Sequence, residues 1–179
     1  LYESGTLSTA AAQLDAVLGG RIARLVKRHD ARGKLGECSL LDVDHAPCER
    51  VLLVGLGKKE SFGRKQYKKA MLAAAAAVAK TAARDAVSFL SVEPIAATDA
   101  YYRGRLAAES VGHALYRVPA IRSTRQPPVP ALKNFGVALA GKDQVKEHLG
   151  RSPDFGDCLS MRMVFELEPE GIKAWMFAA

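Results

Sequence analysis

The clearest hydrophobic pattern in the chain lies between residues 50 and 84. Val51–Val54 is a run of four apolar residues, which is typical of a short buried strand. Gly55-Leu56-Gly57 then predicts a sharp turn. The apolar residues that follow recur at spacings of four, three and four, as on one face of a helix: Tyr67, Met71, Ala74 and Val78. This stretch predicts the first strand and the helix of a βαβ unit.

The pattern before this unit predicts two short helices and one strand. The first helix begins near Ser8, a good N-cap, and ends at Gly19-Gly20. Its expected inward face holds Leu14, Val17 and Leu18. A second helix covers residues 21–28, residues 31–36 form a loop rich in glycine, and residues 39–43 form a strand. Because so few residues join this strand to Val51–Val54, the two strands are expected to pair antiparallel.

The pattern after this unit predicts further alternation of strand and helix. Residues 86–92 are expected to form a strand, and Thr98-Asp99 caps a helix that runs to about Tyr116. The inward face of that helix holds Leu106, Ala107, Val111, Ala114 and Leu115. An irregular connection over residues 121–130, a strand over 135–140 and a short helix over 142–149 complete the pattern. The order predicts an α/β fold with one mixed, mostly parallel sheet flanked by helices.

The segment from Arg151 to Ala179 has a different character. Residues 161–167 are apolar enough for a strand, but no helical pattern follows to cover it. We therefore expect a domain over residues 1–149 and a tail of uncertain order over residues 150–179. The chain begins at Leu1 rather than at methionine, which favours an interior start within a longer protein.

Composition limits the class of protein and the kinds of partner. The chain has 179 residues and is 49% hydrophobic, which suits one domain with a real core. Three cysteines without a C-x-x-C spacing argue against a disulfide scaffold or a structural zinc site, and they suit a reducing cytoplasm. No apolar run approaches the roughly 20 residues of a membrane span.

The net charge of +7 is grouped along the chain. Residues 21–34 hold six Lys and Arg, and residues 58–84 hold eight against the single acid Glu60. Such groups suit an anionic partner such as DNA, or merely keep the protein soluble. The candidate anion contacts are Lys58, Lys59, Lys65, Lys68 and Lys69. Aromatic residues for base stacking are confined to Tyr101-Tyr102, so a DNA contact is expected to be electrostatic and weakly specific.

The Gly55-Leu56-Gly57 turn has two interpretations. A glycine turn between a strand and a helix binds phosphates in many α/β proteins, which would suit a nucleotide such as ADP-ribose. However, the third glycine of G-x-G-x-x-G is replaced here by Glu60, and no P-loop pattern is present. A tight structural turn is the favoured interpretation.

No other group of residues predicts an active site. Asp42, Asp44, His45 and Cys48 cluster near the end of a strand and could in principle bind a metal. However, Asp42 and Asp44 share one side of this extended segment while His45 points to the other, and no second ligand group is apparent, so solvated loop residues are favoured. A surface contact is likewise favoured over an acid–base pair for two residues four apart on a helix: Glu109 and His113. Nucleophile elbows, H-E-x-x-H and paired-carboxylate patterns are absent.

Three motifs resemble the N-terminal domain of the leucyl (cytosol) aminopeptidase family. They are Leu7-Ser8-x-x-Ala11-x-x-Leu14-Asp15 with Gly19-Gly20, Gly33-Lys34-x-Gly36-Glu37, and Arg50-Val51-Leu52-Leu53-Val54-Gly55-Leu56-Gly57-Lys58. The resemblance covers residues 1–149. It implies a macro-domain-like α/β fold and a strand that precedes Leu1.

The resemblance also implies what the intact protein does. Family members are cytoplasmic hexamers that release amino-terminal residues from peptides, with two zinc or manganese ions held by a carboxy-terminal catalytic domain. The family's N-T-D-A-E-G-R-L and N-x-P-P-N runs are not found in this chain. We therefore expect no catalytic, cofactor or metal-binding residue here, and no peptidase activity from the chain alone. A truncated gene, a shifted reading frame and a divergent paralogue all remain open.

Overall fold

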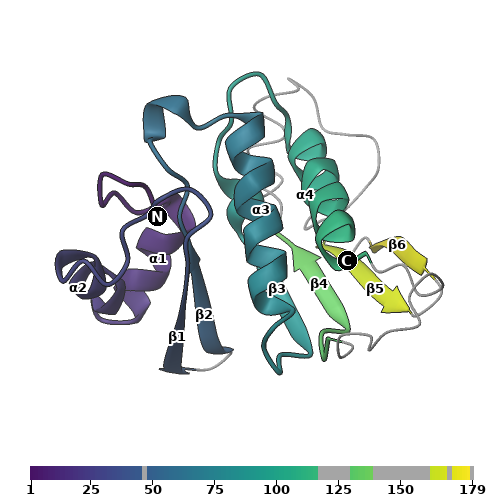
Figure 1. The fold of residues 1–179 in the computed structure, drawn as a ribbon, viewed down its shortest axis with the longest axis horizontal. Helices are drawn as coiled ribbons and strands as arrows, with labels where there is room; N and C mark the ends of the chain where they lie inside the picture. Colours follow the sequence, from purple (N-terminus) through teal and green to yellow (C-terminus); the bar gives the residue numbers. More distant parts are fainter. Residues whose placement is uncertain (46–47, 117–129, 139–161, 169–170, 178–179) are drawn as a thin grey trace, which may run out of the picture.

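The computed structural model describes residues 1–45, 48–116, 130–138, 162–168 and 171–177. It is a mixed α/β structure in which two helices lie side by side over strands, with a strand hairpin and two short helices beside them (Figure 1). No helix in the described part is long and apolar enough to cross a membrane.

A β-hairpin and two short helices form the amino-terminal part. Strands β1 (Cys38–His45) and β2 (Cys48–Val54) pair antiparallel, with Leu41 opposite Val51, which confirms the predicted pairing. Helices α1 (Thr9–Val17) and α2 (Arg21–Lys27) pack on one face of this hairpin. Buried side chains join the helices to the hairpin: Leu1, Ile22, Ala31 and Leu53.

The helix predicted after the glycine turn is present as α3 (Arg64–Val78), preceded by the 3₁₀ helix η1 (Lys59–Ser61). Tyr67, Met71 and Ala74 are buried and Val78 is partly buried, so the predicted inward face is confirmed. The Gln66 side chain accepts a hydrogen bond of 3.2 Å from the Gly63 N–H and so satisfies one amide at the start of the helix.

Helix α4 (Ala100–Leu115) lies against α3 and shares its core (Figure 1). Its N-cap is Asp99, as predicted: the carboxylate oxygen accepts a hydrogen bond of 2.6 Å from the Tyr102 N–H. The predicted inward residues are buried or packed against that core: Leu106, Ala107, Val111, Ala114 and Leu115.

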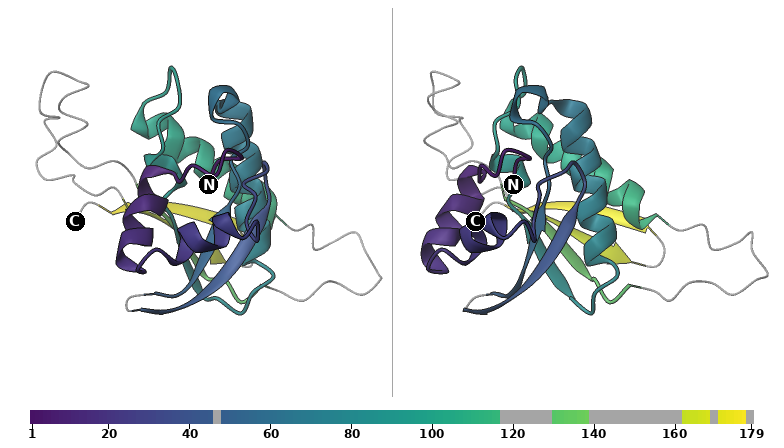
Figure 2. Two further views of the ribbon diagram at one scale, coloured as in Figure 1. Left: turned by 90° about the vertical axis from the view of Figure 1, so that its left-hand side faces the viewer. Right: turned by 60° about the vertical axis from the view of Figure 1, so that its left-hand side comes forward.

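The remaining strands form a second sheet in the order β3-β4-β5-β6. Strand β3 (Asp85–Ser88) pairs parallel with β4 (Asn134–Val137), while β5 (Arg162–Glu168) and β6 (Gly171–Phe177) continue the sheet antiparallel. Phe135 and Val137 are buried under α3 and α4. Figure 2 shows the hairpin and this sheet from two further sides.

The sheet arrangement does not confirm the prediction of one mostly parallel sheet. The described strands form two sheets, and only β3 and β4 pair in parallel. In the described residues β2 and β3 are not neighbours, although they flank α3 in sequence. The order of elements identified the strands but not which strands lie next to each other.

Two local predictions also differ from the structure. The strand expected over 86–92 ends at Ser88, because Leu90–Val92 turns into the 3₁₀ helix η2. Val17 is 58% exposed, since α1 packs through Leu14 and Leu18 instead. Within the segment described above as a tail of uncertain order, residues 162–168 and 171–177 form a strand hairpin on β4, and the first of these strands overlaps the one considered at 161–167. The expected features at 117–129, 139–140 and 142–149 lie outside the described residues.

Candidate functional site

The Gly55-Leu56-Gly57 turn follows β2 and packs tightly against the glycine-rich loop of residues 33–37. The Gly55 N–H donates to the Glu37 carbonyl at 2.7 Å, and the Gly36 N–H donates to the Gly55 carbonyl at 2.9 Å. A side chain at Gly55 would overlap the carbonyl oxygen of Lys34. Glycine is therefore required here by the close approach of two backbone segments.

The amides of this turn are all bonded to the protein's own backbone. Besides Gly55, the Leu56 N–H donates to the Leu1 carbonyl at 2.8 Å, and the Gly57 N–H donates to the Gly33 carbonyl at 2.9 Å. A phosphate cradle needs free N–H groups that point at the ligand. The geometry supports the structural interpretation of the glycines rather than the nucleotide-binding one.

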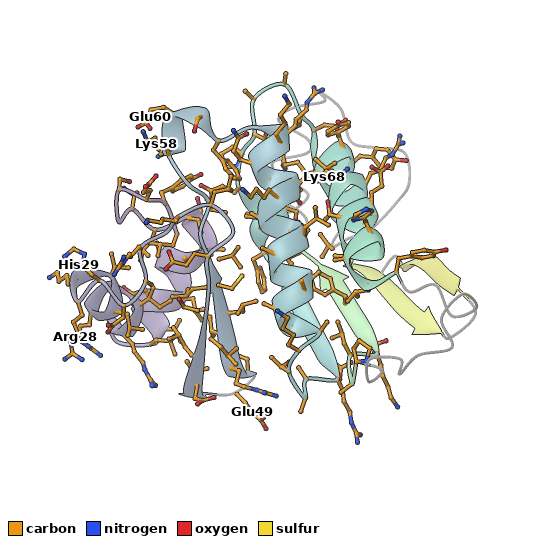
Figure 3. The ribbon with its side chains drawn as sticks, in the orientation of Figure 1. Arg28, His29, Glu49, Lys58, Glu60 and Lys68 are labelled. Carbon is orange, nitrogen blue, oxygen red and sulfur yellow. The ribbon has the colours of Figure 1, made fainter. Side chains whose placement is uncertain are left out.

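The five candidate lysines all lie on the surface, near the start of α3. Lys58 and Lys59 precede the helix, and the Lys59 ammonium lies 5.9 Å from the centre of the Tyr2 ring. Lys65, Lys68 and Lys69 are exposed and share one helical face at spacings of three and four. Figure 3 places Lys58 near one end of α3 and Lys68 along its side, away from the basic Arg28 at the end of α2.

These lysines have no acidic partner among the described side chains. The ion pair found there joins Arg105 to Glu109 at 2.8 Å, on the exposed face of α4. Glu60 is exposed close to Lys58, as Figure 3 shows, but no ion pair links the two. The structure thus brings Lys65, Lys68 and Lys69 together as a cationic stripe, with Lys58 and Lys59 near its start.

A buried carboxylate that sequence reasoning missed ties the amino terminus to the second sheet. Glu93 is 6% exposed; it accepts a hydrogen bond of 2.7 Å from the Tyr2 hydroxyl and one of 3.2 Å from the Thr9 N–H. The second bond serves the first turn of α1, a role that the Ser8 side chain does not fill. Burial, and then the hydrogen bond to Glu93, raise the pKa of the Tyr2 hydroxyl well above its usual value.

A second, partly buried polar cluster joins α3, α4 and η2. The Arg103 guanidinium donates to the Ser91 carbonyl at 2.7 Å and to the Thr98 carbonyl at 3.1 Å. The Tyr67 hydroxyl donates to the Arg103 carbonyl at 3.1 Å, and burial raises the pKa of that hydroxyl. These partners are backbone groups, so the cluster holds the fold and leaves no side chain poised for proton transfer.

The described side chains do not form a metal centre. Asp42 is exposed on β1 opposite Arg50, and nothing is described of the side chains of Asp44 and His45. Within the described part, no three His, Cys, Asp or Glu side chains gather closely enough to hold an ion. The donor set present there does not fit two divalent ions. Glu109 binds Arg105, and no hydrogen bond links it to His113.

A shallow depression lies where the amino terminus meets the glycine-rich loop. Leu1, Gly33 and Gly55 are among its lining residues, and it encloses no room for a water molecule, since the roughly 150 Å³ of space around it includes open solvent. Ligand pockets usually measure roughly 300–1,000 Å³. The depression is too small for a substrate.

Comparison with known proteins gives a consistent set of matches. The profile of the "Cytosol aminopeptidase family, N-terminal domain" matches residues 1–125. A probable cytosol aminopeptidase of Chromobacterium violaceum is 33% identical over 148 residues, which cover 82% of this chain and 28% of that protein. The corresponding protein of Alkalilimnicola ehrlichii is 35% identical over 147 residues, covering 82% of this chain and 30% of its own length. The chain therefore spans less than a third of these relatives.

Solved structures show the same similarity. A mutant of tomato leucine aminopeptidase aligns with a TM-score of 0.58 and 25% identity, over 76% of this chain and 28% of that one. The bottromycin maturation enzyme BotP aligns with a TM-score of 0.51 and 26% identity, over 63% of this chain and 23% of that one.

Proposed function

Because the chain belongs to the cytosol aminopeptidase family, through that family's N-terminal domain, we propose that it is a non-catalytic domain that packs against an aminopeptidase catalytic domain. The observation that carries this proposal is how its buried and partly buried polar groups are used. Glu93, Arg103 and Tyr67 all bond within the fold, and the side chains that the structure describes include no cluster that could hold a metal ion. What remains is a scaffold with surfaces for assembly.

We propose that the intact enzyme is a cytoplasmic hexamer that releases amino-terminal residues from peptides. Two manganese or zinc ions would activate water there, held by the catalytic domain rather than by this one. In such an assembly, residues 1–149 would help subunits associate and control access to the active site, and residues 150–179 would be a divergent tail. The names of the relatives, which are cytosol aminopeptidases, support this proposal.

The same proposal extends to the finer description of the fold. A macro-domain-like sheet has helices on both of its faces. Two arrangements support that description. Helices α3 and α4 lie on one side of the strands, and helices α1 and α2 pack on the other face of the β1–β2 hairpin. The proposal predicts that the complete domain has one continuous sheet.

A binding experiment tests the non-catalytic role. The chain is mixed with the catalytic portion of the Chromobacterium violaceum relative, expressed without the region that this chain matches. We expect co-elution in size-exclusion chromatography, and no release of p-nitroaniline from leucine p-nitroanilide by the chain alone with manganese. Failure to associate would contradict the docking role. Chelator-sensitive release by the chain alone would contradict the non-catalytic role.

A second candidate function is DNA binding through the lysine stripe. The favouring observation is that Lys65, Lys68 and Lys69 are exposed on one face of α3 without acidic partners among the described side chains. Duplex binding weakens as salt rises, with a straight line of log K against log [salt]. Replacing all three lysines with glutamine is expected to reduce the magnitude of that line's slope by about 3. A triple replacement of Arg21, Lys27 and Arg28, which are exposed on and beside α2, removes the same charge and is the matched control.

Fluorescence anisotropy with a labelled 20-base-pair duplex, from low to moderate salt, measures this effect. Equal weakening by both triple variants would show that only net charge matters and that α3 is not the contact surface. No binding of the unmodified chain at low salt would exclude the DNA-binding function.

A further inference from the structure

Strand β1 has one edge that no other strand of the described residues pairs with. Its sheet has the order β1-β2, and Figure 1 shows β1 on the side of the hairpin away from α3. The eight residues of β1 include neither lysine nor proline, which commonly keep an edge strand from pairing. Its regular part is residues 38–42, because the register with β2 shifts between Asp42 and His45. We call the outer side of residues 38–42 the β1 edge.

The backbone groups on the β1 edge can be identified from the pairing with β2. The Glu37 carbonyl accepts from the Gly55 N–H at 2.7 Å and so points toward the β2 side. Opposite Cys38 lies Val54, whose carbonyl accepts from the Leu1 amino group rather than from β1. Successive residues of a strand direct their N–H and C=O groups to opposite edges. The groups of residues 38, 40 and 42 therefore point outward, where another strand can bond to them.

The same three residues share one face of the hairpin. Leu41 packs toward α1 and α2, so its neighbours in the strand face the other way. The Leu40 side chain is 48% exposed, and Asp42 is exposed and takes part in no ion pair among the side chains that the structure describes. A single exposed leucine is ordinary on a protein surface. Here, however, Leu40 lies at the centre of an edge that offers its own hydrogen bonds.

Two copies of the β1 edge complement each other when they pair antiparallel about a two-fold axis at Leu40. The outward N–H and C=O of Leu40 then bond to those of Leu40 in the second copy, and the two exposed side chains cover each other. Asp42 lies opposite Cys38 of the second copy, so the two Asp42 carboxylates stay apart. An axis at Asp42 would set these carboxylates against each other, which is unfavourable.

The charge of Lys80 favours the same register. Burial and then the Glu37 carboxylate raise the pKa of the Cys38 thiol, whereas the Lys80 ammonium acts in the opposite direction, so the Lys80 charge lies near Cys38. Lys80 is exposed just beyond α3 and forms no ion pair with the described side chains. Because Asp42 of the second copy lies opposite Cys38, its carboxylate is attracted by Lys80. The two-fold axis repeats this attraction on the other side.

We propose that the β1 edge is an interface between two copies of this chain, which pair antiparallel at Leu40 into one continuous sheet of the order β2-β1-β1-β2. The pairing satisfies the outward backbone groups, covers both Leu40 side chains and sets each Asp42 near a Lys80 of the other copy. This inference rests on the assembly role proposed above and names one surface that performs it. It does not require the catalytic domain.

Analytical ultracentrifugation of the full chain tests the interface. We expect the average mass to rise from 19.2 kDa toward twice that value as the protein concentration increases. The Leu40→Lys variant places two like charges opposite each other and is expected to weaken the dimer at least about tenfold. The matched control is Val87→Lys, because Val87 is 44% exposed on β3 and adds the same charge away from the β1 edge. We expect this control to associate like the unmodified chain.

A charge exchange tests the register. The Asp42→Lys and Lys80→Glu variants are each expected to weaken the dimer, and the variant that carries both changes is expected to recover most of the association. The recovery should shrink as salt rises, because the attraction between the two side chains is screened. Circular dichroism verifies that every variant is folded before its association is compared.

Other results overturn the proposal. A mass that stays at 19.2 kDa up to about 1 mM, where even a weak complex forms, would exclude the dimer. Equal weakening by Leu40→Lys and Val87→Lys would place the contact elsewhere. Absence of recovery in the double variant would exclude pairing at Leu40. The proposed function fails separately, since it depends on co-elution with a catalytic domain and not on the mass of the chain alone.

Discussion

Replacement of Gly55 by alanine tests whether the glycine turn is held by close packing. An added Cβ would overlap the carbonyl oxygen of Lys34 and come within 2.8 Å of the Gly33 carbonyl carbon. These atoms belong to backbone and cannot rotate away, so the turn and the 33–37 loop must separate. That separation breaks the two hydrogen bonds that Gly55 makes with Glu37 and Gly36.

The expected loss of stability combines two effects. Two backbone hydrogen bonds contribute about 1 kcal/mol each, and forced overpacking costs about 1–3 kcal/mol. Together they predict a loss of about 3–5 kcal/mol in the free energy of unfolding, which lowers Tm by roughly 6–20 °C in a domain of this size. Gly19→Ala is the matched control, because Gly19 has a φ of +60° but nothing within 4 Å of its added Cβ. That change costs about 1–2 kcal/mol of backbone strain alone.

Urea and thermal unfolding, followed by far-ultraviolet circular dichroism, measure both variants beside the unmodified chain. The reasoning requires Gly55→Ala to lose clearly more stability than Gly19→Ala. A loss at Gly55 of about 1 kcal/mol or less would falsify the close-packing argument, because it would mean that the loop moves away at little cost.

Two further predictions concern the buried tyrosines and the α4 cap. Because burial raises the pKa of Tyr2 and Tyr67, the folded state keeps hydroxyl protons that the unfolded state loses above about pH 10, so the free energy of unfolding falls as the pH rises past that value. The Tyr2→Phe variant is expected to show a smaller fall, measured by urea unfolding at pH 9 and pH 11. An unchanged fall in this variant would contradict the assignment of the pH dependence to Tyr2. The Asp99→Ala variant removes the acceptor of the Tyr102 N–H and is expected to lower the free energy of unfolding by about 1 kcal/mol. The Asp99→Asn variant keeps an acceptor and is expected to lose much less stability. Equal losses in both variants would contradict the capping role.

Local patterns predicted the helices well because their causes are local. The spacing of Tyr67, Met71 and Ala74 indicates which face of α3 is buried, and this holds independently of which segment packs against that face. The Asp99 cap likewise acts within one turn of chain. The turn at Gly55 was predicted too, although its tightest neighbour, the 33–37 loop, lies about twenty residues earlier in the sequence.

Sheet pairing and the buried polar groups depend on contacts between distant segments. Residues 86–92 read as one strand, but the chain leaves the sheet after Ser88, where the Ser91 hydroxyl reaches the Ala138 carbonyl and Glu93 reaches Tyr2. No spacing in the sequence links Tyr2 to Glu93, so the sequence did not predict that the Glu93 carboxylate is buried. For the same reason the sequence could not show that β2 and β3 are not neighbours in the described sheets.

The bond between Tyr2 and Glu93 also bears on when the domain folds during synthesis. Its two partners are 91 residues apart, so α1 and the amino terminus cannot reach their final position until Glu93 has left the ribosome. At roughly 5–20 residues per second, that delay lasts about 5–20 s. Throughout this interval the apolar residues of the amino terminus, Leu1 and Tyr2 among them, lack part of their final cover. During this period these apolar residues are accessible to a chaperone.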